Sequence, residues 1–278
     1  MFNFHKSKNA KTKTLIIAEI GINHNGDIDK AKLLIEKAND CGASAVKLQT
    51  YITEKRASKD SPIYEVLKKC ELSFDQQNNL FKFGQDLGIE IFSTPFDEES
   101  VQFLGQTDCK FIKIASFDVT NFKLVRSISS LNKQIIMSTG MTNENELKQS
   151  LSIFDKETVE HKLALLHCIS SYPAPENMAN LASIKALRSF FNGPVGYSDH
   201  TIGWSVPVFS IFAGATIIEK HFTLDCEEEG PDHKLSADPI MLKKIIENVQ
   251  KAEEILGEEK VCISNAESDF LQYKRKSI

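Results

Sequence analysis

The stretch TLIIAEI (14–20), followed by IDKAKLLIEKANDC (28–41) and AVKLQ (45–49), decides the fold. The first and third segments are short and apolar, as buried strands of a parallel sheet are. The middle segment repeats apolar residues at helical spacing, with Ala31, Leu34, Ile35 and Ala38 on one face. Strand, amphipathic helix and strand in this order predict a βαβ unit.

The same alternation continues along the chain. Further strands are predicted at 90–94, 111–114, 134–138, 162–167, 195–198 and 217–221, and helical patterns cover 80–87, 181–191 and 241–256. Strands followed by helices in this number predict a single-domain (β/α)₈ TIM barrel over residues 14–260. An open doubly wound sheet is the alternative, although no glycine-rich GxGxxG turn follows the first strand. Residues 1–13 are predicted to be a flexible tail, and residues 261–278 a C-terminal segment or the start of a linker.

Composition restricts the classes of function. The chain has 278 residues, of which 41% are hydrophobic and 26% charged, as in a globular protein. Its formal charge of −5 argues against a broad nucleic-acid surface. No apolar stretch approaches the roughly 20 residues that span a bilayer, and the polar, basic start lacks a signal-peptide core. We therefore expect a cytoplasmic protein without nucleic-acid or membrane partners. The 6 scattered cysteines form no CxxC pair, which predicts reduced thiols and no cysteine-based metal cluster.

Polar side chains gather where the predicted strands end, which is where TIM barrels build their active sites. The residues at these ends, or just after them, are Glu19, Lys47, Gln49, Lys113, Ser116, Ser138, Tyr172, Ser198, His200, Glu219 and His221. Strand ends are wetter than strand middles, so any one of these residues has a purely structural explanation. The recurrence of lysine, serine and histidine around most of the ring favours a functional site.

Lys47 and Lys113 lie inside otherwise apolar strands. A buried lysine is costly without a partner, so each should face a carboxylate or an anionic ligand. With the serines at neighbouring strand ends, the two lysines predict a cradle for a phosphate or carboxylate group. A structural ion pair inside the barrel is the alternative.

His200 and His221 end two adjacent predicted strands, which lie about 4.8 Å apart in a sheet. Their imidazoles could supply half of a divalent metal site, with water or substrate oxygen as the other ligands. Core histidines or an acid–base pair are the alternatives. Because successive strand residues face opposite sides, Glu219 shares the face of His221 and Lys220 does not. Asp232 follows in a loop, GPDHKLSADP (230–239), that could cover the mouth or be a solvated turn.

Nine motifs in order resemble the sialic acid synthase family, which includes N-acetylneuraminate, legionaminate, pseudaminate and spore-coat polysaccharide synthases. They are AEIGINHNG (18–26), KLQTY (47–51), FSTPFD (92–97), KIAS (113–116), MSTGM (137–141), HCISSYPAP (167–175), GYSDHT (196–201), IEKHFT (218–223) and GPDHKLSADP (230–239). The resemblance implies a transferase that condenses phosphoenolpyruvate with an N-acetylated amino-sugar aldehyde, N-acetylmannosamine or a relative. The implied products are a sialic-acid-type nonulosonate and phosphate.

The resemblance also implies roles for the matching positions. Phosphoenolpyruvate would be bound by Lys47, Lys113, Ser116, Ser138 and Ser198, with Lys113 also counted as catalytic. His200 and His221 would bind a divalent metal, Mn²⁺, with Mg²⁺ or Co²⁺ as alternatives. The sugar and the reaction centre would be lined by Glu19, Gln49, Tyr172, Glu219 and Asp232. Glu19 and Glu219 would be the general acid–base groups.

Two departures from the family pattern bear on the sugar. Ser170 stands where some members carry an asparagine that contacts the sugar. Many members also continue into an antifreeze-like domain, which brings an arginine to the active site of the partner subunit. We therefore expect a homodimer. Three alternatives stay open for the second domain: the chain is a natural short form, it is a piece of a longer protein, or a separate antifreeze-like domain completes its sugar site. For the function, the alternatives are a related phosphoenolpyruvate–aldose barrel synthase and a non-catalytic sugar- or partner-binding barrel.

Overall fold

Eight strands form a closed barrel in the structure, a computed structural model that describes residues 13–275. They are β1 (Leu15–Gly21), β2 (Ala45–Thr50), β3 (Glu90–Pro95), β4 (Phe111–Ile114), β5 (Gln134–Ser138), β6 (Leu163–Cys168), β7 (Val195–Asp199) and β8 (Ile217–His221). Each strand pairs in parallel with the next along the chain, and β8 closes the ring on β1. This confirms the predicted single-domain TIM barrel, and every predicted strand end lies within one residue of the observed one.

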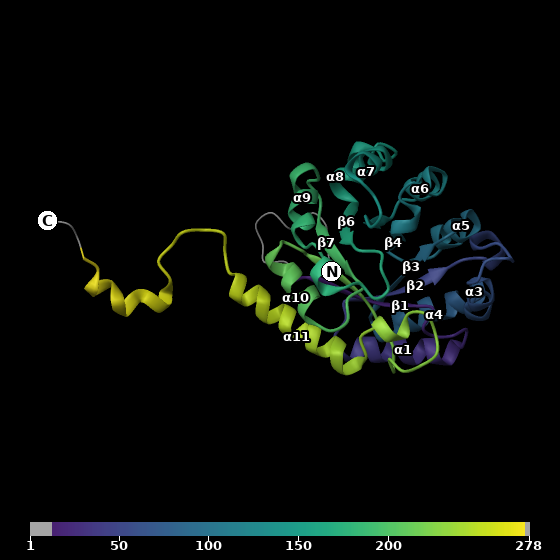
Figure 1. The fold of residues 1–278 in the computed structure, drawn as a ribbon, viewed down its shortest axis with the longest axis horizontal. Coiled ribbons are helices and arrows are strands. Elements are labelled where there is room, and N and C mark those ends of the chain that lie inside the picture. The colour runs from purple at the N-terminus through teal and green to yellow at the C-terminus, as the bar shows by residue number, and fades with distance from the viewer. Residues whose placement is uncertain (1–12, 276–278) are drawn as a thin grey trace.

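Helices surround the strands on the outside of the barrel (Figure 1). They are α1 (Ile28–Asp40), α2 (Thr53–Arg56), α3 (Tyr64–Cys70), α4 (Phe74–Leu87), α5 (Glu98–Gln106), α6 (Phe122–Ser129), α7 (Glu144–Leu151), α8 (Lys156–His161), α9 (Ala182–Phe190), α10 (Ser205–Phe212) and α11 (Pro239–Leu256). The helices predicted at 28–41, 181–191 and 241–256 are confirmed as α1, α9 and α11.

Helix α4 begins earlier than the prediction of 80–87, at Phe74. Its N-terminus is fixed by a capping box, in which the Gln76 backbone N–H donates to Ser73 Oγ and the Ser73 backbone N–H donates to Gln76 Oε1. The prediction followed the apolar spacing alone and missed this first polar turn.

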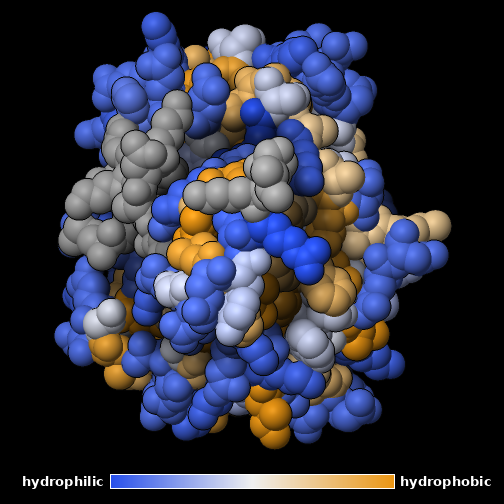
Figure 2. All heavy atoms as spheres, turned by 90° about the vertical axis from the view of Figure 1, so that its left-hand side faces the viewer, coloured by the Kyte–Doolittle hydropathy of each residue, from blue (hydrophilic) through white to orange (hydrophobic). Residues whose placement is uncertain are grey.

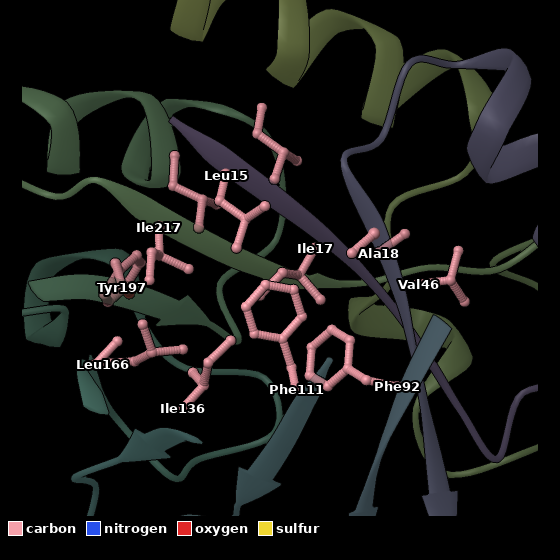
Figure 3. Close-up of a cluster of buried hydrophobic side chains, with 14 of the residues drawn as sticks. Leu15, Ile17, Ala18, Val46, Phe92, Phe111, Ile136, Leu166, Tyr197 and Ile217 are labelled. Carbon is pink, nitrogen blue, oxygen red and sulfur yellow. The ribbon is translucent and has the colours of Figure 1, made fainter. Parts of the chain in front are cut away.

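The barrel interior changes from apolar to polar along the strands. Side chains two residues apart share a face, so the apolar layer lies directly beneath the polar strand ends: Ile17 precedes Glu19, Phe111 precedes Lys113, Ile136 precedes Ser138 and Ile217 precedes Glu219. All four apolar side chains are buried in the main core (Figure 3). Burial of such a side chain contributes about 1.5–3 kcal/mol. The barrel thus supplies a rigid floor for the polar layer.

A second, smaller hydrophobic cluster lies apart from the main core. It consists of Ile22, Tyr51, Leu67 and Cys70, with Phe96 packed against it. These residues come from the ends of β1, β2 and β3 and from α3, so the cluster holds the segment between β2 and α4 against the mouth of the barrel.

The described residues after α11 lie outside the barrel. The predicted tail at 1–13 falls outside the described residues except for Lys13. After α11, residues 257–275 are exposed and include a 3₁₀ helix at Asn265–Tyr273, which runs away from the barrel (Figure 1). Figure 2 shows that the face on this side is mainly hydrophilic, with scattered apolar patches. Within residues 13–275, no helix has the length and apolar character required to cross a membrane.

Candidate active site

A cavity of about 920 Å³ opens at the carboxyl ends of the strands. Every residue predicted for the site lines it: Glu19, Lys47, Gln49, Lys113, Ser116, Ser138, Tyr172, Ser198, His200, Glu219, His221 and Asp232. Sheet register explains part of this convergence, because Glu19 is the strand partner of both Lys47 and His221, and Ser198 is the partner of Glu219. The structure therefore brings the predicted residues together, while their roles stay predictions.

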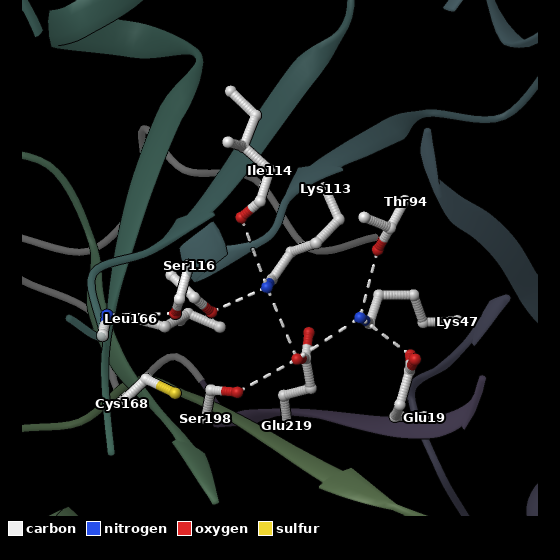
Figure 4. A network of polar contacts seen from close by, with 12 residues as sticks. Glu19, Lys47, Thr94, Lys113, Ile114, Ser116, Leu166, Cys168, Ser198 and Glu219 are labelled. Carbon is white, nitrogen blue, oxygen red and sulfur yellow. Dashed lines mark hydrogen bonds and ion pairs between the residues drawn. The ribbon is translucent and has the colours of Figure 1, made fainter. Parts of the chain in front are cut away.

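Glu219 lies between the two buried lysines on the floor of the cavity (Figure 4). Its Oε1 is 3.4 Å from Lys47 Nζ and 3.5 Å from Lys113 Nζ. The Ser198 hydroxyl donates to the same oxygen at 3.1 Å. Each lysine thus has the carboxylate partner that a buried ammonium requires.

Each lysine also reaches a neighbouring strand. Lys47 Nζ lies 2.8 Å from Glu19 Oε2 and donates to Thr94 Oγ1 at 3.2 Å. Lys113 Nζ donates to Ser138 Oγ at 2.6 Å. Positive and negative groups therefore alternate across the floor of the cavity. An anionic ligand can bind the two lysines in place of the carboxylates.

The carboxyl groups of Glu19 and Glu219 have different proton affinities. Burial raises the pKa of Glu19 to about 7, although the charge of Lys47 opposes the rise. Burial alone would also raise the pKa of Glu219, but the charges of Lys113 and Lys47 and the Ser198 hydrogen bond hold it below its usual value. Two carboxyl groups with pKa values displaced in opposite directions can act as an acid and a base at the same pH.

A close backbone approach shapes the cavity wall next to Lys113. The Gly140 backbone N–H donates to Ser116 Oγ at 3.0 Å. A Cβ atom at Gly140 would lie 2.4 Å from Ser170 Oγ and 2.9 Å from Ser116 Oγ, so any other residue there would force these two hydroxyls to move. Ser170, where some sialic acid synthases carry an asparagine, is turned toward Gly140 and is not among the residues that line the cavity.

His200 and His221 lie side by side, with ring centroids 5.5 Å apart. His200 Nδ1 is 2.8 Å from the Ile169 carbonyl oxygen, which leaves its Nε2 for a ligand. His221 Nδ1 is buried without a hydrogen-bond partner and lies 3.8 Å from Asp232 Oδ2. Burial lowers the pKa of His221 well below its usual value, so its imidazole is neutral and has a lone pair to donate.

This donor set suits a divalent metal ion with imidazole and oxygen ligands. Among residues 13–275, no group of three or more histidine, cysteine, aspartate or glutamate side chains is arranged to hold a metal. The protein would therefore contribute two imidazoles, and water or substrate oxygens would complete the coordination. The unpartnered Nδ1 of His221 is the observation that favours this fit.

Comparison with known proteins gives the family. The model of the NeuB family matches residues 34–261. The chain belongs to the NeuB family. It is 44% identical over 265 residues to an uncharacterised protein of Methanocaldococcus jannaschii, covering 95% of this chain and 78% of that one. It is 38% identical over 281 residues to the N,N'-diacetyllegionaminic acid synthase of Campylobacter jejuni, covering 96% and 84%.

A solved structure of the same family agrees with the fold. The N-acetylneuraminic acid synthetase of Leptospira borgpetersenii, crystallised in complex with citrate, superposes with a TM-score of 0.91 at 34% identity, covering 95% of this chain and 92% of that one. NeuB enzymes are phosphoenolpyruvate-dependent synthases of sialic-acid-type nonulosonates, and they generally depend on a divalent metal ion. The synthase predicted from the motifs is confirmed.

Behind the two histidines of this NeuB site lies a buried ion pair. Lys220 Nζ is 2.8 Å from Asp199 Oδ2 and also donates to the Thr201 carbonyl oxygen. Asp199 Oδ1 accepts from the Thr201 backbone N–H at 3.0 Å. The pair confirms that Lys220 faces away from Glu219, and it fastens the ends of β7 and β8, next to His200 and His221.

Several residues that line the NeuB cavity were not selected in the sequence analysis, and two of them contact predicted site residues. One is Cys168, whose Sγ is 3.7 Å from His200 Nδ1. The other is Arg56 of α2, whose Nη1 donates to Gln49 Oε1 at 2.9 Å. Gln49 Nε2 in turn donates to Glu19 Oε1 at 3.2 Å, so Arg56 is connected to the floor of the site.

Proposed function

We propose that the chain condenses phosphoenolpyruvate with an N-acetylated amino sugar in its open aldehyde form, N-acetylmannosamine or a relative. The products are a nonulosonate and inorganic phosphate. The observation that carries this proposal is the buried alternation of Lys47, Glu219 and Lys113 on the cavity floor, with serine hydroxyls on either side.

Phosphoenolpyruvate carries a phosphate and a carboxylate, and the floor offers donors for both. Lys113 and Ser138 are hydrogen-bonded to each other and can turn to a phosphate oxygen, as can Ser116 beside Gly140. Lys47 can meet the second anionic group. Hydrogen bonds to a charged group contribute about 1.5–3 kcal/mol each.

The chemistry needs one acid and one base. C3 of phosphoenolpyruvate attacks the aldehyde carbon, and the protonated Glu19 carboxyl supplies the proton that turns the aldehyde oxygen into a hydroxyl. A water molecule adds at C2, and ionised Glu219 takes its proton. Glu219 Oε2 is buried without a hydrogen-bond partner and is available for this transfer. The C2–O bond to phosphate then breaks, and Lys113 stabilises the departing phosphate.

The metal site belongs to this proposal. His200 and His221 would hold Mn²⁺, with Mg²⁺ or Co²⁺ as alternatives, and such an ion polarises a carbonyl group as a Lewis acid. The Tyr172 ring packs against His200, with ring centroids 4.2 Å apart and ring planes tilted by 38°, which restricts the orientation of that imidazole.

Exposed apolar side chains stand around the mouth. Phe117, Met141, Tyr172 and Ile202 follow β4, β5, β6 and β7, and each is at least 43% exposed. A ring of this kind is typical of a surface that another protein covers. It supports the further proposal that the site works in a homodimer and is closed by an antifreeze-like domain.

Phosphate release tests the function directly. With phosphoenolpyruvate, Mn²⁺ and a panel of N-acetylated hexoses, we expect inorganic phosphate to appear with at least one sugar, together with an equal amount of keto acid. Without the sugar, phosphoenolpyruvate should stay intact. Equal phosphate release with and without every sugar of the panel would contradict the proposal.

The pKa of Glu19 predicts the pH dependence. Because Glu19 must be protonated to act as the acid, kcat/KM should fall as the pH rises through about 7. In Glu19→Gln this fall should disappear, and the rate should drop by about 10²–10⁴-fold, as expected for loss of a general acid. The measurement is kcat/KM from pH 5.5 to 9, a range that extends up to roughly two pH units from the pKa of Glu19.

Glu144→Gln is the matched control, because Glu144 lies on the surface of α7 and its side chain is 61% exposed. Its pH profile should equal that of the unmodified protein. If Glu19→Gln keeps the same fall near pH 7, Glu19 is not the acid.

A further inference from the structure

Arg56 places a positive charge at the outer part of the cavity without an ion-pair partner. Its Nη1 donates to the neutral amide oxygen of Gln49. In the part of the chain that the structure describes, no carboxylate forms an ion pair with it. Lys47 and Lys113, by contrast, each meet a carboxylate. A half-buried guanidinium in this state has N–H groups available for a ligand.

Two aromatic rings fix the plane of this guanidinium. Its central carbon lies 3.6 Å from the centroid of Phe96 and 4.6 Å from that of Tyr51. The rings meet edge to face at 75°, and Tyr51 Oη donates to the Leu67 carbonyl oxygen at 2.9 Å. The two rings pack against the guanidinium and hold it in place, and its N–H groups donate in its own plane. A planar acceptor fits this arrangement best.

The charges nearby distinguish between possible acceptors. Asp118 and Asp232 line the same cavity. Both carboxyl groups lie within reach of the charge of Arg56. A phosphate placed at Arg56 would meet these two acidic groups as well. A neutral amide would instead offer its carbonyl oxygen to the guanidinium and its N–H to a carboxylate.

Apolar side chains complete this part of the cavity. Ile22, Ile63 and Leu67 line it on the side of the small hydrophobic cluster. They suit the methyl group of an acetamido substituent and offer nothing to a hydroxyl or a phosphate.

We propose that Arg56 is a specificity-determining residue that binds the acylamido group of the sugar substrate. The guanidinium donates to the amide carbonyl oxygen, a neighbouring aspartate accepts the amide N–H, and the apolar wall holds the acyl methyl group. The inference rests on the proposed function, since it concerns the sugar of that same reaction.

The test is calorimetric binding of three probes to the protein without phosphoenolpyruvate, so that no condensation takes place: N-acetylmannosamine, mannose and N-acetylmannosamine 6-phosphate. Arg56→Met keeps the unbranched apolar stem of the side chain but removes the guanidinium and its donors. The substitution should weaken the binding of N-acetylmannosamine by about tenfold or more, because one charge-assisted hydrogen bond is lost. Mannose and phosphoenolpyruvate should bind as before. Arg126→Met, at an exposed position of α6, should bind all probes like the unmodified protein.

Several results would overturn the inference. If Arg56→Met weakens the binding of mannose and of N-acetylmannosamine equally, Arg56 does not bind the acylamido group. If Arg56→Met weakens the binding of N-acetylmannosamine 6-phosphate alone, Arg56 binds a phosphate group instead. Unmodified protein that binds N-acetylmannosamine no better than mannose would also overturn it. Thermal melting checks folding, and Arg56→Gln replaces Arg56→Met if the latter does not fold. Because binding is measured apart from phosphate release, failure of the reaction counts only against the proposed function.

Discussion

Lys113→Met and Lys47→Met should each weaken phosphoenolpyruvate binding by at least about tenfold, because each removes a charge-assisted contact to an anionic group. The loss of activity should be larger still. Either change leaves Glu219 buried with one lysine instead of two, so its pKa rises and a smaller fraction of it is ionised and able to accept a proton. Calorimetry with phosphoenolpyruvate measures the first effect, and phosphate release measures the second.

Lys110→Met is the matched control. Lys110 immediately precedes β4, at the opposite end of the barrel from the cavity, and its side chain is 53% exposed. Its phosphoenolpyruvate affinity should be unchanged. If both floor variants bind phosphoenolpyruvate as tightly as this control, the ligand does not lie on the floor.

The second large effect concerns the metal. His200→Ala and His221→Ala should each lose the bound divalent ion, because each removes one of the two imidazole ligands. Lewis-acid stabilisation is worth several kcal/mol, so the rate should fall by about 10²-fold or more. Metal content after dialysis, measured by elemental analysis, gives a readout that does not depend on activity.

His161→Ala on α8 controls for a general effect of removing a histidine, since this side chain is exposed and remote from the cavity. It should retain its metal. If both His200→Ala and His221→Ala keep full metal occupancy, these two histidines do not bind the metal.

The sequence predicts the barrel and its polar mouth well because both depend on local rules. Successive residues of a strand face opposite sides, so a polar residue at the end of an apolar strand faces either inward or outward. This rule correctly predicted that Glu219 and Lys220 face opposite sides. Buried lysines must have partners, which predicted a carboxylate or an anionic ligand beside Lys47 and beside Lys113.

Arg56 could not be found in this way. It lies in a four-residue helix between strands, and its position depends on how α2 packs against Phe96, which is 40 residues further along the chain. The start of α4 was missed for a simpler reason. Ser73 and Gln76 form a capping box that is visible in the sequence, but the apolar spacing used for the prediction begins only at Leu80.

The small hydrophobic cluster of Ile22, Tyr51, Leu67 and Cys70 has a consequence for the evolution of the enzyme. It holds the β2–α4 segment, including Arg56, separately from the main core that carries the lysines and histidines. Packing changes in this segment are therefore separated from the barrel core, and effects of mutations on separate clusters are close to additive, except along the hydrogen bonds from Arg56 through Gln49 to Glu19. Substrate range can thus diverge by drift in one short insert while the phosphoenolpyruvate chemistry is inherited unchanged.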